Sequence, residues 1–285
     1  MTSQLRAPTD ADVADVVRMT SEHWPEPVDE DFVRRAWSSP GFEREHDARI
    51  EPHAYADVQQ LGDGRVWMSL RGRPTATLVD WAEARASEQG TRVLSGSWVA
   101  NEPVLAELRR RDFRLIRHSH RMTIELDAAI VAPAWPAGVQ VRTFRDGDER
   151  TFYDAQQETF ADTWEPIDEP YAEWAHWLLE APSFDPELWF LGQDAGETAG
   201  FAICKVHPGD PELGWVQTLG VRRPWRGRGL GRALLLHAFA EFKRRGLRRA
   251  GLGVDAENPT GAAALYESVG MRAVGRFELY EKVVA

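Results

Sequence analysis

Residues 222–235 read RRPWRGRGLGRALL, and this order of charge, glycine and apolar residues constrains the fold more than any other part of the sequence. The preceding segment GWVQTLGV (214–221) predicts a strand, and the apolar residues after the loop recur at helical spacing. A helix that begins directly after a strand offers unpaired backbone N–H groups and a partial positive charge. Because glycines let a backbone approach an anion closely, the stretch predicts a diphosphate site at a helix N-terminus. A plain surface turn is the alternative.

The arginines around this loop offer forked donors that suit phosphate oxygens; they are Arg222, Arg223, Arg226, Arg228 and Arg232. Two familiar phosphate loops do not match. A P-loop ends in G-K-[ST], which is absent here. The glycines also lack the spacing of a dinucleotide-binding turn, and no acidic residue closes a second strand about twenty residues later.

The order of segments in the first half resembles that in the second. Leu78 and Leu234 lie 156 residues apart, as do Gly90 and Gly246, and the offset is 157 between Asn101 and Asn258. This nearly constant offset predicts a tandem duplication. Two unrelated α/β domains are the alternative. The Pro- and Ala-rich segment around 127–138 predicts a linker, so the expected domains are 1–127 and 139–285, joined by 128–138.

The two halves differ at the glycine loop. Sixteen positions separate Pro74 from Gly90, whereas twenty-two separate Pro224 from Gly246. The first half has Arg71-Gly72-Arg73-Pro74 in place of the loop, and a proline there removes a backbone donor. We therefore expect the N-terminal half to be structural and the C-terminal half to be catalytic.

Composition excludes several classes of protein. The net charge of −11 disfavours nucleic acid and anionic membranes as partners. Cys204 is the single cysteine, so neither an intramolecular disulfide nor a cysteine metal cage is expected, and we predict no metal site. The N-terminus lacks the apolar region of a signal peptide, and no stretch approaches eighteen apolar residues. These features predict a cytoplasmic protein that binds no membrane.

The motif Arg226-x-x-Gly229-x-Gly231 after this strand resembles the [R/Q]-x-x-G-x-[G/A] motif of the GNAT acyl-CoA N-acyltransferases. Asn258 and the segment AALYESVGM resemble a second motif of that family, with Met271 where phenylalanine is usual. The tandem arrangement is similar to that of mycothiol synthase-like acetyltransferases. The resemblance implies an α/β (α+β) fold of two GNAT domains, each with a mixed, mostly antiparallel sheet flanked by helices.

In that family the loop amides bind the diphosphate of coenzyme A, and the preceding strand pairs with its pantetheine arm. The resemblance therefore implies acetyl-CoA as co-substrate. The residues implied to bind it are Leu219, Gly220, Val221, Arg226, Gly227, Arg228, Gly229, Leu230, Gly231, Arg232 and Asn258. Capping of the following helix is an equal explanation for Asn258.

The resemblance also assigns catalytic roles. Tyr266 matches the family's acid that protonates the departing thiolate, although a tyrosine packed on the sheet is the plain alternative. The first half has Leu108 at the aligned position. Mycothiol synthase-like sequences carry a glutamate on the strand before the loop, where this chain has Trp215. We expect Glu212, just upstream, to be the base, acting through water, with a carboxylate from the first helices of this half as the alternative.

The segment FADTWEPIDEPYAEWAHW (160–177) follows the first helix of the second half and mixes carboxylates with aromatic rings. Such a mixture attracts a cationic amine through charge and cation–π contact. Asp162, Trp164 and Glu165 are the expected acceptor contacts, with a solvated acidic loop over core tryptophans as the alternative. The sequence thus predicts an N-acetyltransferase of small primary amines that works as a monomer with two pseudo-dimeric domains. The alternatives are a sensor of acyl-CoA or small molecules and a protein N-acetyltransferase.

Overall fold

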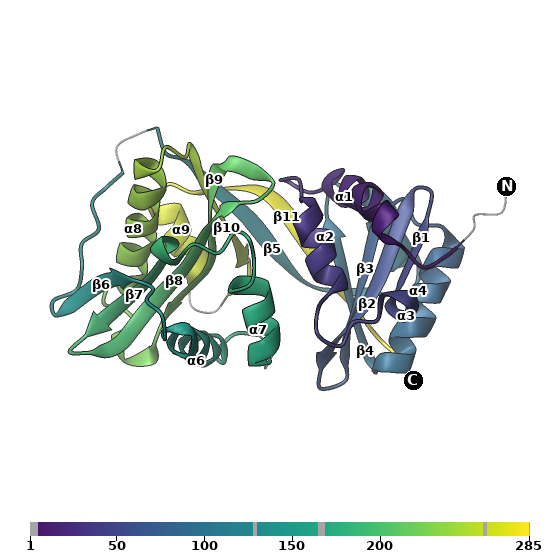
Figure 1. Ribbon diagram of the computed structural model, residues 1–285, viewed down its shortest axis with the longest axis horizontal. Coiled ribbons are helices and arrows are strands. Elements are labelled where there is room, and N and C mark those ends of the chain that lie inside the picture. Colours follow the sequence, from purple (N-terminus) through teal and green to yellow (C-terminus); the bar gives the residue numbers. More distant parts are fainter. Residues whose placement is uncertain (1–4, 128–129, 165–168, 259–260, 285) are drawn as a thin grey trace. The chain divides into compact units, whose positions relative to one another are not determined.

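The computed structural model describes residues 5–127, 130–164, 169–258 and 261–284. The chain divides into two compact units (Figure 1). Unit 1 comprises Met1–His120 and Gly275–Ala285, and unit 2 comprises Arg121–Val274. Two strands, β5 (Arg114–Glu125) and β11 (Arg272–Val283), therefore contribute residues to both units.

Unit 1 is a sheet covered by helices on both faces. Its helices are α1 (Val13–Ser21), α2 (Glu30–Trp37), α3 (Arg44–Asp47), α4 (Ala76–Gln89) and α5 (Glu102–Arg110). Its strands are β1 (Ala48–Glu51), β2 (Ala54–Gly62), β3 (Arg65–Gly72) and β4 (Arg92–Trp98), together with parts of β5 and β11. The strand order is β1-β2-β3-β4-β11, and within it the pair β3–β4 is parallel and the others are antiparallel.

Unit 2 repeats this plan. Its helices are α6 (Glu149–Phe160), α7 (Tyr171–Leu178), α8 (Leu230–Arg244) and α9 (Ala262–Ser268). Its strands are β6 (Val139–Thr143), β7 (Trp189–Asp194), β8 (Glu197–His207), β9 (Asp210–Val221) and β10 (Arg249–Asp255). The strand order is β5-β10-β9-β8-β7-β6; β9 and β10 are parallel, and β6 through β9 pair antiparallel.

The order of elements agrees with an internal duplication. After the first helices, which are α1–α3 in one half and α6 and α7 in the other, each half continues with three antiparallel strands, a helix, a parallel strand, a short helix and a last strand. The second half also has β6 before its helices. The predicted fold class, a mixed and mostly antiparallel sheet flanked by helices, is confirmed. Among the described residues, none of the helices is both long and apolar enough to cross a bilayer.

Each unit buries apolar residues on both faces of its sheet. In unit 2, α8 packs closely on one face because β9 has a glycine there: a Cβ at Gly214 would lie 2.3 Å from the Phe242 ring. On the other face α6 and α7 bury an aromatic cluster that includes Phe152, Trp174 and Trp189. Figure 1 shows α8 and the α6–α7 pair on different sides of β7 and β8. Side chains are thus packed on both faces of the unit 2 sheet. This packing holds β9 and β10, whose ends border the site described below.

The units do not follow the predicted division at 128–138. The C-terminal part of β11 belongs to unit 1, because Phe277–Val283 pair with β4. The end of β5 belongs to unit 2, where the N–H of Leu126 donates to the Arg248 carbonyl at 2.7 Å. Ile130 and Trp135, from the expected linker, pack against the core of unit 2. This exchange of strands had no sequence signal, and the division into domains 1–127 and 139–285 stays a prediction.

Candidate functional site

The candidate site of unit 2 begins where two parallel strands separate. Residues Leu213–Val216 of β9 pair with Arg249–Leu252 of β10, and the pairing ends there although both strands continue. On its other side β9 pairs with β8 through a register shift, since Cys204 is opposite Val216 but Ile203 is opposite Thr218. Gln217 is the extra residue of this bulge. A bulge re-aims the strand, so β9 turns away from β10 at this residue.

The glycine loop follows β9 and ends at the N-terminus of α8. A short 3₁₀ turn, Arg223–Trp225, is followed by Gly227 with φ 74° and Gly229 with φ 85°. A Cβ at either glycine would meet no atom within 4 Å, so the backbone conformation, and not crowding, requires glycine there. Gly229 is the N-cap of α8 and no side chain caps this end. The first-turn N–H groups of α8 therefore provide a positive helix end that favours an anion.

A cavity of about 660 Å³ connects these features. Its walls come from the end of β9, the loop, β10, α9 and the C-terminal end of α6. Predicted residues that line it are Trp164, Leu219, Gly220, Val221, Arg226, Gly227, Gly229, Leu230, Gly231, Arg232, Asn258 and Tyr266. The structure thus gathers most of the residues predicted for the coenzyme around a single cavity. Arg228, Asp162 and Glu212 are not among the lining residues, and Glu165 lies outside the described residues.

Several loop arginines are paired within the protein. The Arg222 Nε donates to Glu158 at 2.7 Å, and Arg223 and Arg226 both bind Asp162. The Arg228 guanidinium lies 3.8 Å from Asp194. The sequence indicated these arginines as phosphate ligands, but most of this charge neutralises carboxylates of unit 2. The backbone at the start of α8 is therefore the stronger anion-binding element of the loop.

Asp162 was expected to contact the acceptor. Its carboxylate instead accepts hydrogen bonds from two arginines of the loop, and these bonds, first that of Arg223 and then that of Arg226, lower the pKa of Asp162 below its usual range. Its negative charge is thus neutralised within the protein. Trp164, two residues further on, does line the cavity.

Tyr266 lies on α9 and lines the cavity, with 8 % of its surface exposed. Burial raises the pKa of Tyr266 to about 12, so the phenol keeps its proton across the physiological range. It is available as a hydrogen-bond donor. The aligned Leu108 on α5 is fully buried in the core of unit 1, where it can only pack.

The expected base Glu212 is exposed near the start of β9. Its carboxylate lies 3.2 Å from Arg248, and its N–H donates to Asp210. Trp215 is buried, and the Arg121 guanidinium stacks on its ring at 3.8 Å. Among the described residues that line the cavity, Asp255 at the end of β10 is the one carboxylate, and the sequence analysis missed it.

Unit 1 contains the same separation of strands but a different helix end. Its β3 and β4 pair only over Arg65–Met68 and Arg92–Ser95. The following helix, α4, has Thr75 as its N-cap, whose hydroxyl accepts from the Leu78 N–H. The buried Glu51 carboxylate accepts from both the N–H and the hydroxyl of Thr75 at 2.8 Å. A side-chain cap and a carboxylate of the protein itself thus lie at this helix end.

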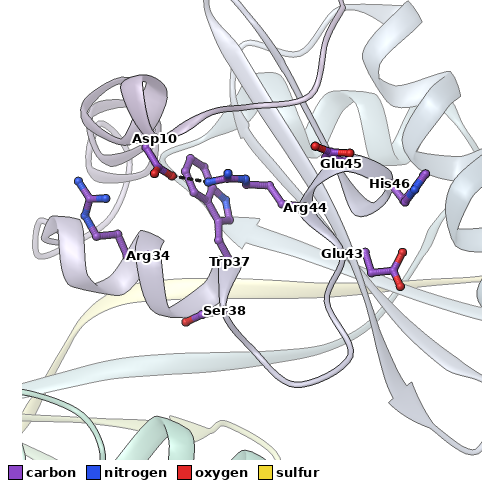
Figure 2. Close-up of a pocket in the computed structure, with 8 residues that line it drawn as sticks. All are labelled: Asp10, Arg34, Trp37, Ser38, Glu43, Arg44, Glu45 and His46. Atoms are coloured by element: carbon purple, nitrogen blue, oxygen red, sulfur yellow. Dashed lines mark hydrogen bonds and ion pairs between the residues drawn. The ribbon is translucent and has the colours of Figure 1, made fainter.

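Another hollow, of about 710 Å³, lies on unit 1 beside α2 and α3 (Figure 2). Arg44 lies over the Trp37 ring at 5.0 Å and is paired with Asp10 at 2.5 Å. Figure 2 shows these three side chains together, with Glu45 and His46 further along α3. The central cation already has its partners, and none of the described residues that line this hollow is a glycine.

Comparisons with known proteins agree with this geometry. Residues 150–271 match the model of the Acetyltransferase (GNAT) family. The mycothiol acetyltransferase of Acidothermus cellulolyticus is 33 % identical over 236 residues, which cover 75 % of this chain and 68 % of that protein. Other curated relatives have the same name, and the chain spans about half of their length.

Solved structures match over nearly the whole chain. A GCN5-related N-acetyltransferase from Sphaerobacter thermophilus has a TM-score of 0.76 at 30 % identity, covering 98 % of this chain and 95 % of that one. A tandem GNAT protein from the clavulanic acid biosynthesis pathway has a TM-score of 0.73 at 15 % identity, with 98 % of both chains covered, and so shows the fold alone. From the diverging strands, the glycine loop and these matches together, we conclude that the chain belongs to the GNAT family of acetyltransferases.

Proposed function

We propose that the chain is an acetyl-CoA-dependent N-acetyltransferase in which unit 2 transfers the acetyl group to the primary amine of a small molecule. The N-terminus of α8 carries this proposal, because it has no side-chain cap, follows two glycines of positive φ and opens into the cavity. A helix end of this kind binds a diphosphate through its backbone N–H groups. The names of the curated relatives support acetyl transfer.

The separation of β9 from β10 supports a place for the pantetheine arm. Beyond Val216, β9 has no pairing with β10. Its backbone N–H and C=O groups on that side can pair with the amides of an extended ligand, as an added strand would. Bound in this way, the thioester would lie near the point where the strands separate. Orientation of the two reactants supplies much of the rate in such a transfer.

Tyr266 supplies the acid in this proposal. The neutral amine attacks the thioester carbonyl, and the ammonium of the tetrahedral intermediate loses its proton to water. The C–S bond then breaks as the carbonyl re-forms, the thiolate takes a proton from the phenol, and the phenolate regains a proton from solvent. A phenol with a pKa of about 12 remains protonated until the thiolate forms. Acid assistance of this type contributes about 10²- to 10⁴-fold in rate.

Two roles assigned from the sequence receive no support. Glu212 makes an ion pair with Arg248 on an exposed surface, and Asp162 is paired with loop arginines. We therefore assign the base to solvent water at the cavity mouth. Asp255 is the carboxylate positioned to orient such a water, since it lines the same cavity. A cytoplasmic location and a monomeric state stay predictions.

The test combines binding with turnover. Calorimetry with acetyl-CoA should show one site per chain, and thiol release should then be followed over a panel of amines. The first amine in that panel should be the acceptor of the mycothiol acetyltransferases, because the curated relatives have that name. Absence of binding at millimolar acetyl-CoA would contradict the proposal.

Trp215 favours a second candidate, a protein that binds an acyl-CoA without transferring the acyl group. Its ring takes the position where a glutamate base was expected and is covered by Arg121. Binding of acetyl-CoA with no thiol release for any amine of the panel would support this sensor. Turnover that depends on Tyr266 would exclude it.

A further inference from the structure

Asp162 connects two parts of unit 2 that are far apart in sequence. The Nε of Arg223 donates to its Oδ2 at 2.9 Å, and Nη1 of Arg226 donates to the same oxygen at 2.7 Å. Asp162 lies just after α6, whereas both arginines lie in the glycine loop. One carboxylate therefore bridges the end of α6 and the loop.

Arg226 extends this bridge through its remaining donors. Its Nε donates to the Val221 carbonyl at 3.0 Å, and Nη2 reaches the Thr159 carbonyl at 3.5 Å. The guanidinium thus contacts the last residue of β9, a carbonyl of α6 and the carboxylate of Asp162. Because the fork of arginine is planar and rigid, these contacts fix the relative position of the two segments.

The residues around Asp162 form a wall of the cavity. Thr159, Phe160, Thr163 and Trp164 line it, and the loop residues 227 and 229–232 line it as well. Asp162 itself does not line the cavity, and its side chain joins the wall segment to the loop through the two arginines. An anion bound at the start of α8 would lie on the same loop as Arg223 and Arg226. Such an anion would weaken their hold on Asp162.

We propose that Asp162 is a positioning residue that transmits occupancy of the α8 loop to the cavity wall at residues 159–164. This inference rests on the proposed function. Coenzyme binding at the loop and amine binding at the wall are the two events that this carboxylate couples. Asp162 is therefore not an acceptor contact but the link between the two binding events.

Hydrogen exchange with acetyl-CoA as the probe tests the link. In the wild type, saturating acetyl-CoA should protect amides in both 227–232 and 159–164. In Asp162→Asn, which keeps the shape but loses the charge, the loop should still be protected while protection at 159–164 is lost. The affinity for acetyl-CoA should change by about threefold to thirtyfold, as expected for residues that transmit coupling. S-acetylpantetheine, which lacks the diphosphate, should bind both proteins equally.

Two further variants make the result specific. Asp148→Asn breaks the ion pair with Arg142 at the other end of α6, which involves no arginine of the loop, and should leave both regions protected. Arg223→Gln removes only the exposed partner of Asp162 and should give an intermediate loss even if Asp162→Asn fails to fold. Wild-type protection of 159–164 in Asp162→Asn would overturn the inference alone. Absence of acetyl-CoA binding to the wild type would instead overturn the proposed function and the inference together.

Discussion

The N-termini of α4 and α8 occupy equivalent places in the two units and have opposite arrangements. At α4 the buried Glu51 carboxylate accepts two hydrogen bonds from the N-cap Thr75. At α8 the N-cap is Gly229, with no capping side chain. Each helix connects two parallel strands that pair over only four residues each. The same backbone plan thus produces a self-satisfied helix end in unit 1 and an open one in unit 2.

Under the proposed function, this difference separates a unit that binds the coenzyme from a unit that supports it. A helix end needs negative charge or hydrogen-bond acceptors. An internal carboxylate provides them permanently and stabilises the unit, whereas an open end leaves the same groups for a ligand at a cost in stability. The predictions below therefore separate binding and rate, which should depend on unit 2, from stability, which should depend on unit 1.

The largest effect on rate is expected for Tyr266→Phe. This change removes the proton donor that unit 2 has and that unit 1, with Leu108 at the aligned position, does not have. The kcat should fall by about 10²- to 10⁴-fold, because the thiolate then lacks its proton donor. The KM for acetyl-CoA should change little. Steady-state thiol release measures both. Because the raised pKa keeps the phenol protonated, the wild type should show no alkaline loss of kcat from this group below about pH 11. An unchanged kcat in the variant would assign Tyr266 to packing.

The next effect is expected for Gly231→Asp, which places a carboxylate at the start of α8, as Glu51 of β1 does at the start of α4. A Cβ at Gly231 meets its nearest atoms at 3.5 Å, so the side chain fits. Repulsion of the diphosphate by about 3–4 kcal/mol should weaken acetyl-CoA binding roughly 100-fold or more. The melting temperature should not fall, because acidic groups stabilise a first helical turn. Calorimetry and thermal unfolding test this, with Gly231→Asn as the neutral control; equal affinity of the two variants would contradict it.

A smaller effect is expected for Glu51→Gln in unit 1. The loss of charged hydrogen bonds to Thr75 should lower the free energy of unfolding by about 1.5–3 kcal/mol. Urea denaturation measures this change. The affinity for acetyl-CoA and a stoichiometry of one should be unaltered, because unit 1 also lacks the glycine loop. If the variant bound a second equivalent of acetyl-CoA, Glu51 alone would be what prevents unit 1 from binding the coenzyme.

The smallest effect is expected for the stability contributed by the ion pair between Arg6 and Asp12, near the start of unit 1. Asp12 accepts from Arg6 at 2.6 Å and from the Thr9 N–H at 2.7 Å, and these bonds lower the pKa of Asp12, the bond from Arg6 first. A lowered folded-state pKa gives stability that is present above the unfolded value of about 4 and is lost as the pH falls toward the folded value. Asp12→Asn should therefore destabilise the chain at pH 7 and much less at pH 2. Equal losses at both pH values would contradict this.

Local features were predictable from the sequence. The strand, glycine loop and helix at 214–244 depend on neighbouring residues, and Tyr266 reaches the cavity because α9 follows β10 directly. The roles of side chains were less predictable. Asp162 lies more than sixty residues from its arginine partners, so neither spacing nor composition pointed to the pair.

The prediction of Glu212 as base depended on strand geometry that the sequence does not display. The bulge at Gln217 and the end of pairing at Val216 set where the cavity begins, and Glu212 lies on the far side of that point. Similarly, the buried contact of Glu51 with Thr75 requires β1 and the start of α4 to meet, which no local pattern indicates. Tertiary contacts therefore decided which charged residues reach the site.

The pairing of β11 with β4 has a consequence for biosynthesis. Phe277–Val283 complete the sheet of unit 1, yet a ribosome makes them after all of unit 2. While unit 2 is translated, β4 lacks its partner β11, so one edge of β4 is unpaired and another strand could pair with it. Folding of the earliest segment is thus finished by the latest one, and chaperone protection of that edge during synthesis should matter more here than in enzymes whose domains close one after another.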